Sequence, residues 1–437
     1  MVWKWHKLVH VCRRWRQLIF ESPHRLNIQI LCTHKTLIRE NFCIWPAFPI
    51  AIDYDSSERR IGPEGRDNVI AALGHLYRVS RVRLKIYPGE LKKMIKAMQV
   101  PFPGLTCLEI YSNDKNAPVL PAGFLGGSAP LLQTIALRDI PFPTLPVLLL
   151  STSNLISLDL SRIPRAGYIS PEAMVVSLAT LTKLETLIIT FLSVIFHPDK
   201  TSPPPVTRIV LPALTTFTFQ GACAYLENFV ARIESPQLDR ILINYSNQLF
   251  DVPVAQLAKF LDRSMSSKLS LLRHARVSFG YYFTFSMYRH PVPLSIQNIS
   301  CEGIDRQLSK IAQSFRQFSN ILSNVVHLRF DVQPGQSHQF VDATNDVEWL
   351  LFLCQFPTVK SLYVSQDLPA FVALVLEDID VEMVAEVLPS LDLICLEGRP
   401  ASSIERFVGA CQLSGRSVTV ADTKTEFSKR LASSVSE

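Results

Sequence analysis

A short apolar string of the form L-x-x-L-x-L recurs along the chain and constrains its fold more than any other feature. The first copy is Val79, Val82 and Leu84, and the copies up to Leu238 begin 26, 27, 23, 29, 30 and 24 residues apart. Residues two apart in a strand face the same way, so the last two apolar positions of each string point into one core. One unit buries little surface alone, and stacking the strands in parallel makes the core continuous. Ten copies occur, beginning at Val79, Leu105, Leu132, Leu155, Leu184, Leu214, Leu238, Val325, Val359 and Leu391.

Helical spacing of apolar residues appears between these strings. The ranges 67–76, 90–98, 171–181 and 254–261 each carry an apolar stripe at i, i+3 and i+4. Helices that alternate with short strands favour parallel pairing. The pattern therefore predicts an α/β fold, an irregular leucine-rich-repeat solenoid with parallel strands on the concave side and helices outside. The alternative is an ordinary α/β domain whose parallel strands are rich in leucine.

The repeat weakens near residues 245–320, where an irregular insertion is expected. The aromatic run 281–285 is either an exposed recognition loop or, as we favour, a set of rings that fill a widened core. Ser402 and Glu405 have capping-box spacing, Gly415 suits a helix stop, and 418–420 suits a last strand. We thus predict a solenoid over 67–420, a linker over 28–66 and a flexible tail over 421–437.

The N-terminal segment has a different pattern. Its apolar residues form one helical stripe over residues 3–20, and Pro23 ends that helix. The segment 8–18 resembles the last helix of an F-box, and 22–28 and 44–50 resemble the F-box family of mushroom-forming fungi, in which irregular leucine-rich repeats follow the F-box. The resemblance makes 1–27 a partial, N-terminally truncated F-box helix, because no Leu-Pro-led first helix precedes Trp15. It also implies F-box core or adaptor-interface residues, namely Trp5, Leu8, Val11, Cys12, Trp15 and Leu18.

This resemblance implies a non-catalytic substrate-recognition subunit of a cullin-type (SCF) ubiquitin ligase. Its partners would be the adaptor subunit of the cullin ligase and a protein substrate bound on the solenoid. The alternative is a stand-alone interaction scaffold that does not bind the adaptor. Outside the complex we expect a monomer, with a cytoplasmic and/or nuclear location.

Composition and motifs narrow the function further. The net charge of +6 is spread along the chain, so we expect no nucleic-acid partner. No apolar stretch is long enough to predict a membrane span. The nine cysteines form no CxxC pair. Their scattered positions predict buried free thiols in a protein of a reducing compartment. Because no phosphate-loop, dinucleotide, protease or metal spacing occurs, we predict no catalytic, cofactor or metal residues and no enzyme.

Alternate strand positions are expected to face the concave surface. In the first half of the chain these positions are mostly small and polar, whereas the second half offers larger side chains suited to a partner's contact centre. Plain solvated strand faces are the alternative. The predicted partner-binding residues are Arg240, Asn244, His327, Arg329, Asp331 and Tyr363.

Overall fold

The computed structural model describes most of the chain and divides it into two compact units. Unit 1 comprises 1–193 and 209–214, and unit 2 comprises 194–208 and 215–437. Each is described by itself below. The described residues are 11–21, 29–33, 48–56, 63–112, 114, 116–192, 208–246, 254–279, 282–287, 294–299, 311–332, 346–365, 368–377, 379, 381–399, 404–421 and 424–434.

Unit 1 is built on a parallel sheet in which strand order follows chain order from β1 to β7. Each neighbouring pair is parallel, with register shifts in β2–β3 and β6–β7, and the apolar positions align, so that Leu84 pairs with Ile110 and Ile110 with Leu137. These apolar positions are buried, whereas their strand neighbours face the other way. The strands are β1 (Ile30–Cys32), β2 (Ile50–Asp55), β3 (Val79–Ile86), β4 (Cys107–Ser112), β5 (Thr134–Arg138), β6 (Ser157–Ile163) and β7 (Thr186–Phe191), with β8 (Ile209–Val210) outside this series.

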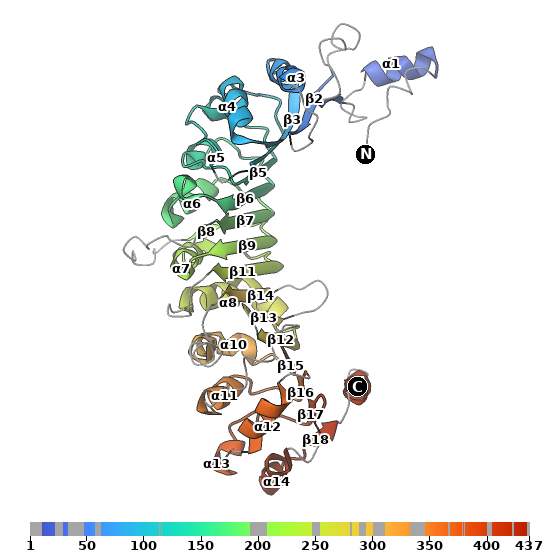
Figure 1. The fold of residues 1–437 in the computed structure, drawn as a ribbon, viewed down its shortest axis with the longest axis vertical. Coiled ribbons are helices and arrows are strands. Elements are labelled where there is room, and N and C mark those ends of the chain that lie inside the picture. Colours follow the sequence, from blue (N-terminus) through green and yellow to red (C-terminus); the bar gives the residue numbers. More distant parts are fainter. Residues whose placement is uncertain are drawn as a thin grey trace. The chain divides into compact units, whose positions relative to one another are not determined.

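From α3 to α6, the helices of unit 1 lie between successive strands in the chain and along one face of its sheet (Figure 1). In α4 the stripe of Leu91, Met94 and Ile95 is buried, because residues three and four apart share one helix face. Ser170 caps α6 by accepting the amide of Ala173, and Pro171 occupies its first turn. The helices are α1 (Arg13–Glu21), α3 (Pro63–Leu73), α4 (Pro88–Ala97), η2 (Phe124–Gly127), α5 (Leu145–Leu149), η3 (Arg165–Gly167) and α6 (Pro171–Leu178).

Unit 2 also has a sheet with helices on one face, but its strand order leaves chain order once. The order is β9-β11-β14-β13-β12-β15-β16-β17-β18. The strands are β9 (Thr216–Gly221), β11 (Arg240–Ser246), β12 (His274–Phe279), β13 (Tyr282–Met287), β14 (Leu294–Ile299), β15 (His327–Val332), β16 (Ser361–Val364), β17 (Leu393–Leu396) and β18 (Thr419–Ala421), with β10 (Ile233–Glu234) outside this order.

The exception to chain order is an antiparallel meander within residues 245–320. Strand β13 pairs antiparallel with β12 and β14, while β14 pairs parallel with β11 and β12 with β15. The predicted irregularity is thus a reversal of strand direction inside a continuous sheet. Phe283 and Phe285 of the aromatic run are buried and pack edge-on against Phe315. The rings fill the core, as we favoured, and Tyr281 lies outside the described residues.

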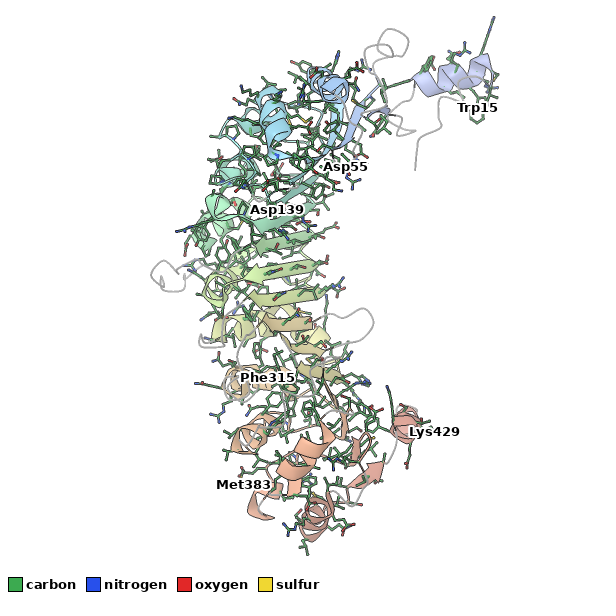
Figure 2. All side chains as sticks on the ribbon, in the orientation of Figure 1. Trp15, Asp55, Asp139, Phe315, Met383 and Lys429 are labelled. Carbon is green, nitrogen blue, oxygen red and sulfur yellow. The ribbon has the colours of Figure 1, made fainter. Side chains whose placement is uncertain are left out.

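The helices α7 to α14 of unit 2 lie along one face of its sheet (Figure 1). They are α7 (Cys223–Val230), α8 (Ala255–Leu269), η4 (Arg316–Phe318), α10 (Ser319–Leu322), α11 (Asp346–Leu353), α12 (Pro369–Glu377), α13 (Val381–Val384), α14 (Glu405–Leu413) and α15 (Lys424–Ser434). Figure 2 shows that α15, which carries Lys429, lies on the opposite side of the sheet from α13, which carries Met383.

The fold class agrees with the prediction: this is an irregular leucine-rich-repeat solenoid. All ten apolar strings form strands of the two sheets, and the four helical stripes fall on α3, α4, α6 and α8. Gly415 follows α14 with a positive φ, and 419–421 is the last strand. The helix α14 begins at Glu405 with Ile404 as its N-cap; Ser402, the predicted cap, lies outside the described residues.

Two predicted boundaries were wrong. The range 28–66 was expected to be a linker, yet β1 and β2 lie in it and extend the sheet from β3. Their strings are too short and too poor in leucine to be recognised as repeats. The range 421–437 was expected to be a flexible tail, yet it contains α15, whose Phe427 is buried against the sheet. Phe427 anchors this helix, whose other described side chains, over 424–429, are polar.

Candidate interaction surface on the open sheet face

Each sheet has one face without the helix layer, and the register identifies the side chains on it. In unit 2 we call this surface the open face; it spans β9 to β15. It consists of the positions that alternate with the buried apolar residues of these six strands. These positions are Thr216, Thr218, Gln220, Arg240, Leu242, Asn244, His274, Arg276, Ser278, Thr284, Ser286, Ser295, Gln297, His327, Arg329 and Asp331.

The structure separates the predicted partner-binding residues into two groups. Arg240 and Asn244 lie on β11, whereas His327, Arg329 and Asp331 lie on β15. Three strands of the meander separate β11 from β15. At about 4.8 Å per strand, the two groups are roughly 19 Å apart. They belong to one surface but form no single contact centre.

The group on β15 gains a member that sequence reasoning missed. Arg276 on β12 pairs in register with Arg329, and its Nε donates to Asp331 Oδ2 over 2.7 Å. Arg329 Nε donates to the same carboxylate, at 2.9 Å and 2.8 Å from its two oxygens. The Asp331 side chain is only 7% exposed, while that of Arg276 is 50% exposed. Two guanidinium groups thus cover one buried carboxylate and leave an excess of positive charge.

Two histidines extend this group along the same strands. The rings of His274 and His327 stack with centroids 4.6 Å apart. Burial, followed by the charges of His274, Arg273 and Lys360, lowers the pKa of His327 to about 4. Burial also lowers the pKa of His274. Both imidazoles are therefore neutral at pH 7, chiefly because they are buried, and the nearby positive charges add to the lowering at His327.

Tyr363 was predicted as an exposed anchor, and that prediction was wrong. It is 3% exposed and belongs to a buried cluster with Leu393, Cys395, Ala421 and Phe427. The ring of Phe427, from α15, lies 5.4 Å from the Tyr363 ring, and the Tyr363 hydroxyl donates to Glu397. Arg329 lies over the ring at 4.7 Å from its centroid. Tyr363 therefore holds Arg329 in place and seats α15, and it does not face a partner in this arrangement.

Unit 1 carries a polar pocket at the carboxyl ends of β3 to β6 that the sequence analysis did not single out. Its volume is ≈ 750 Å³. Arg162 Nε lies 3.0 Å from Asp139, Lys85 lies 3.2 Å from Asp55 and Arg83 lies 3.3 Å from Glu109. The basic groups thus have acidic neighbours, and the pocket has mixed charge. It is lined by Arg83, Lys85, Tyr111, Ser112, Asp114, Arg138, Asp139 and Arg162.

A sequence signal for this pocket does exist in β3. Arg83 and Lys85 alternate there with the buried Val82, Leu84 and Ile86, which places both cations on the face away from the core. The signal is weak, because charged residues on an outer strand face are common. The left-handed backbone of Asp139 and Arg162, each at φ 56°, is a tertiary feature that no spacing indicates.

The predicted F-box residues lie at the N-terminus and are only partly described. Trp5 and Leu8 lie outside the described residues. Val11, Trp15 and Leu18 are 63%, 48% and 54% exposed, and Cys12 is exposed as well. Because Trp15 and Leu18 are three apart on α1, they share one helix face. Large apolar side chains are therefore left uncovered on α1, where Figure 2 labels Trp15.

The described part of the chain was also examined for cysteine pairing, metal-ligand groups and membrane-spanning helices. Seven cysteines are free thiols there, and five of them are buried. Within the described residues no group of three or more His, Cys, Asp or Glu side chains has the proximity to hold a metal ion. Nor does any described helix combine the length and apolar character needed to cross a membrane.

The chain was compared with family models, curated proteins and solved structures, and only solved structures matched. No family model matches the chain, and no curated protein matches it. Among solved structures, the leucine-rich repeat-containing protein LegL7 of Legionella pneumophila is 14% identical with a TM-score of 0.27, covering 77% of this chain and 99% of its own. A leucine-rich-repeat protein of Leptospira interrogans is 11% identical with a TM-score of 0.29, covering 89% and 99%. At these TM-scores the likenesses carry no argument, and the fold assignment rests on strand order and register.

Proposed function

We propose that this protein is a non-catalytic interaction scaffold that binds a protein partner on the open face of unit 2. The observation that carries the proposal is that six adjacent strands present mostly polar and basic side chains on the face opposite the described helices α7, α8, α10 and α11. A rigid sheet holds such side chains in place before a partner binds, which lowers the entropic cost of association. The scaffold itself performs no chemistry.

We further propose that the scaffold is the substrate-recognition subunit of a cullin-type ubiquitin ligase. The support is the resemblance of 8–18 to the last F-box helix, together with the exposure of Trp15 and Leu18 on α1. Apolar side chains exposed on one helix face gain most from burial against a partner. Such a subunit acts by raising the local concentration of its substrate near a conjugating enzyme.

Binding of the purified full-length chain to the purified adaptor subunit of a cullin ligase tests the second proposal. We expect capture of the adaptor, and we expect Trp15→Ala with Leu18→Ala to weaken it at least tenfold, since each buried large apolar side chain contributes roughly 2 kcal/mol. Leu413→Ala, which removes an exposed leucine at the end of α14, is the matched control and should bind as the natural chain does.

A stand-alone scaffold is the second candidate, and the same experiment separates the two. A folded chain that shows no adaptor binding would overturn the ligase proposal and leave the interaction scaffold standing. Equal loss of binding in the control and in the α1 variant would also count against a role for α1.

A further inference from the structure

The open face of unit 2 presents one sign of charge. Its described positions include Arg240, Arg276 and Arg329, and its single described acid is Asp331. Because Asp331 is buried under two guanidinium groups, a partner meets the arginines and not the carboxylate. Arg273 and Lys360, both exposed, lie close enough to act on His327 and extend the positive region to the starts of β12 and β16.

Beside these charges runs a row of amide and hydroxyl side chains, one from each strand. The register aligns Gln220 with Asn244, Asn244 with Gln297, Gln297 with Thr284, and Thr284 with Ser278, and the row ends beside Asp331. Amides and hydroxyls each donate and accept, as the peptide backbone does.

We propose that the open face of unit 2 binds an extended acidic segment of a partner protein, with the carboxylates of its Asp and Glu residues on Arg276 and Arg329 and its backbone along the amide and hydroxyl row. This inference rests on the proposed scaffold function and names the class of partner. Arg276 and Arg329 are direct neighbours on β12 and β15, so each guanidinium can take one carboxylate of two adjacent acidic side chains. Cation–π contact and the shared carboxylate hold Arg329 rigidly for this role.

A single-stranded nucleic acid is the competing anion, and the open face favours the peptide. Such binding relies on aromatic side chains on which bases stack. The open face, as far as it is described, carries the two stacked histidines but no Phe, Tyr or Trp, and the nearby Tyr363 is covered by Phe427. Side-chain amides and hydroxyls, in contrast, match a polypeptide backbone.

Fluorescence anisotropy with the full-length chain tests the proposal. The probe is a labelled peptide of alternating Glu and Ser, compared with versions of the same length in which Gln, Lys or phosphoserine replaces Glu. We expect the Glu peptide to bind at least tenfold more tightly than the Gln peptide, since ion-paired hydrogen bonds are roughly twice as strong as neutral ones. Binding should weaken as salt is raised, and the Lys peptide should not bind.

Three variants sharpen the test. Arg276→Gln should weaken binding of the Glu peptide about tenfold. The variant should still fold, because Arg329 remains to neutralise Asp331. Asp331→Asn should tighten binding, because it removes the one acid beneath the arginines. Arg165→Gln, an exposed arginine of η3 in unit 1, is the matched control and should change nothing. Circular dichroism checks folding, and if Asp331→Asn does not fold, Arg276→Gln decides.

A second readout is the NMR titration of His327. A bound carboxylate beside Arg329 should raise the pKa of His327 from about 4, an effect that added Gln peptide should lack. Equal affinity for the Glu and Gln peptides, or no effect of Arg276→Gln, would overturn the acidic class while leaving the scaffold function intact. More than tenfold tighter binding of phosphoserine peptide, or displacement by single-stranded RNA, would also overturn it. If no peptide of any charge binds, the scaffold function assigned to this face fails as well.

Discussion

Gly126 and Gly127 are adjacent and have similar backbone angles, but their surroundings give them different structural roles. Both belong to the short 3-10 helix η2. Both have positive φ, but only Gly126 lies in close contact: a Cβ there would meet Pro101 at 2.7 Å. A Cβ on Gly127 would meet nothing within 4 Å. Gly126 therefore serves close packing of two loops, which is a structural role.

Gly126→Ala should destabilise unit 1 more than Gly127→Ala does. Positive φ costs each alanine about 1 kcal/mol, and the clash with Pro101 adds about 2 kcal/mol at position 126 only. The free energies of unfolding from urea titrations of the two variants measure the difference. Equal losses would show that the turn moves away from Pro101 at no cost.

Glu227 is a residue whose surroundings bear on the pH dependence of stability. Its carboxylate accepts the backbone N–H groups of Gln256, at 2.7 Å, and Leu257, at 2.9 Å, and so joins α7 to the first turn of α8. Burial raises the pKa of Glu227 to about 7, against the lowering effect of these two hydrogen bonds and of Lys259. Ionisation is therefore less favourable in the folded chain than in the unfolded chain.

This raised pKa gives a definite sign to the pH effect. The contribution of Glu227 to stability is fully present below its unfolded pKa and is lost as pH rises toward about 7, a loss of roughly 3 kcal/mol. Glu227→Gln should abolish that part of the pH dependence, since an amide does not ionise. Thermal unfolding midpoints across this pH range measure it, with the exposed Glu185→Gln as control. Parallel pH profiles of the natural chain and Glu227→Gln would contradict the assignment.

At the scale of elements, α15 is the clearest case of tertiary contact overriding sequence character. Most of its described side chains are exposed, and Phe427 is its buried anchor, on Tyr363 and its neighbours. An isolated helix of this length is marginal in water. Packing against β16 and β17 is therefore what makes α15 stable.

Phe427→Ala should release α15 without unfolding the sheet. Removing a buried phenylalanine side chain lowers stability by about 3 kcal/mol. Because α15 is a terminal element, this loss should unfold α15 locally. Hydrogen–deuterium exchange should show faster exchange over 424–434 and over β18, with β9 and β11 unchanged. Lys429→Ala, on the exposed side of the same helix, should leave exchange as it is. Slow exchange of α15 in the Phe427 variant would show that other contacts hold it.

At the scale of the whole molecule, the sequence determined the architecture through a period that only one kind of packing satisfies. Strings such as Leu158 and Leu160 must be buried on one side, and their recurrence makes each strand the neighbour of the next. The ten strands that carry the string, the helices α3, α4, α6 and α8, and the alternation of buried and outward residues followed from that local pattern. So did the placement of Arg329 and Asp331 on an outward face, because strand periodicity is a property of the backbone.

Only the tertiary structure decided which outward residues meet. The meander reverses strand order, so Arg276, 53 residues before Arg329 in the chain, becomes its direct neighbour, while three strands lie between Arg240 and Arg329. The helix α15 folds back over Tyr363 and removes it from the surface. The apolar period fixes what a residue faces, since burial is set by local alternation. It leaves open what lies beside it, since that depends on which distant strand the chain places there.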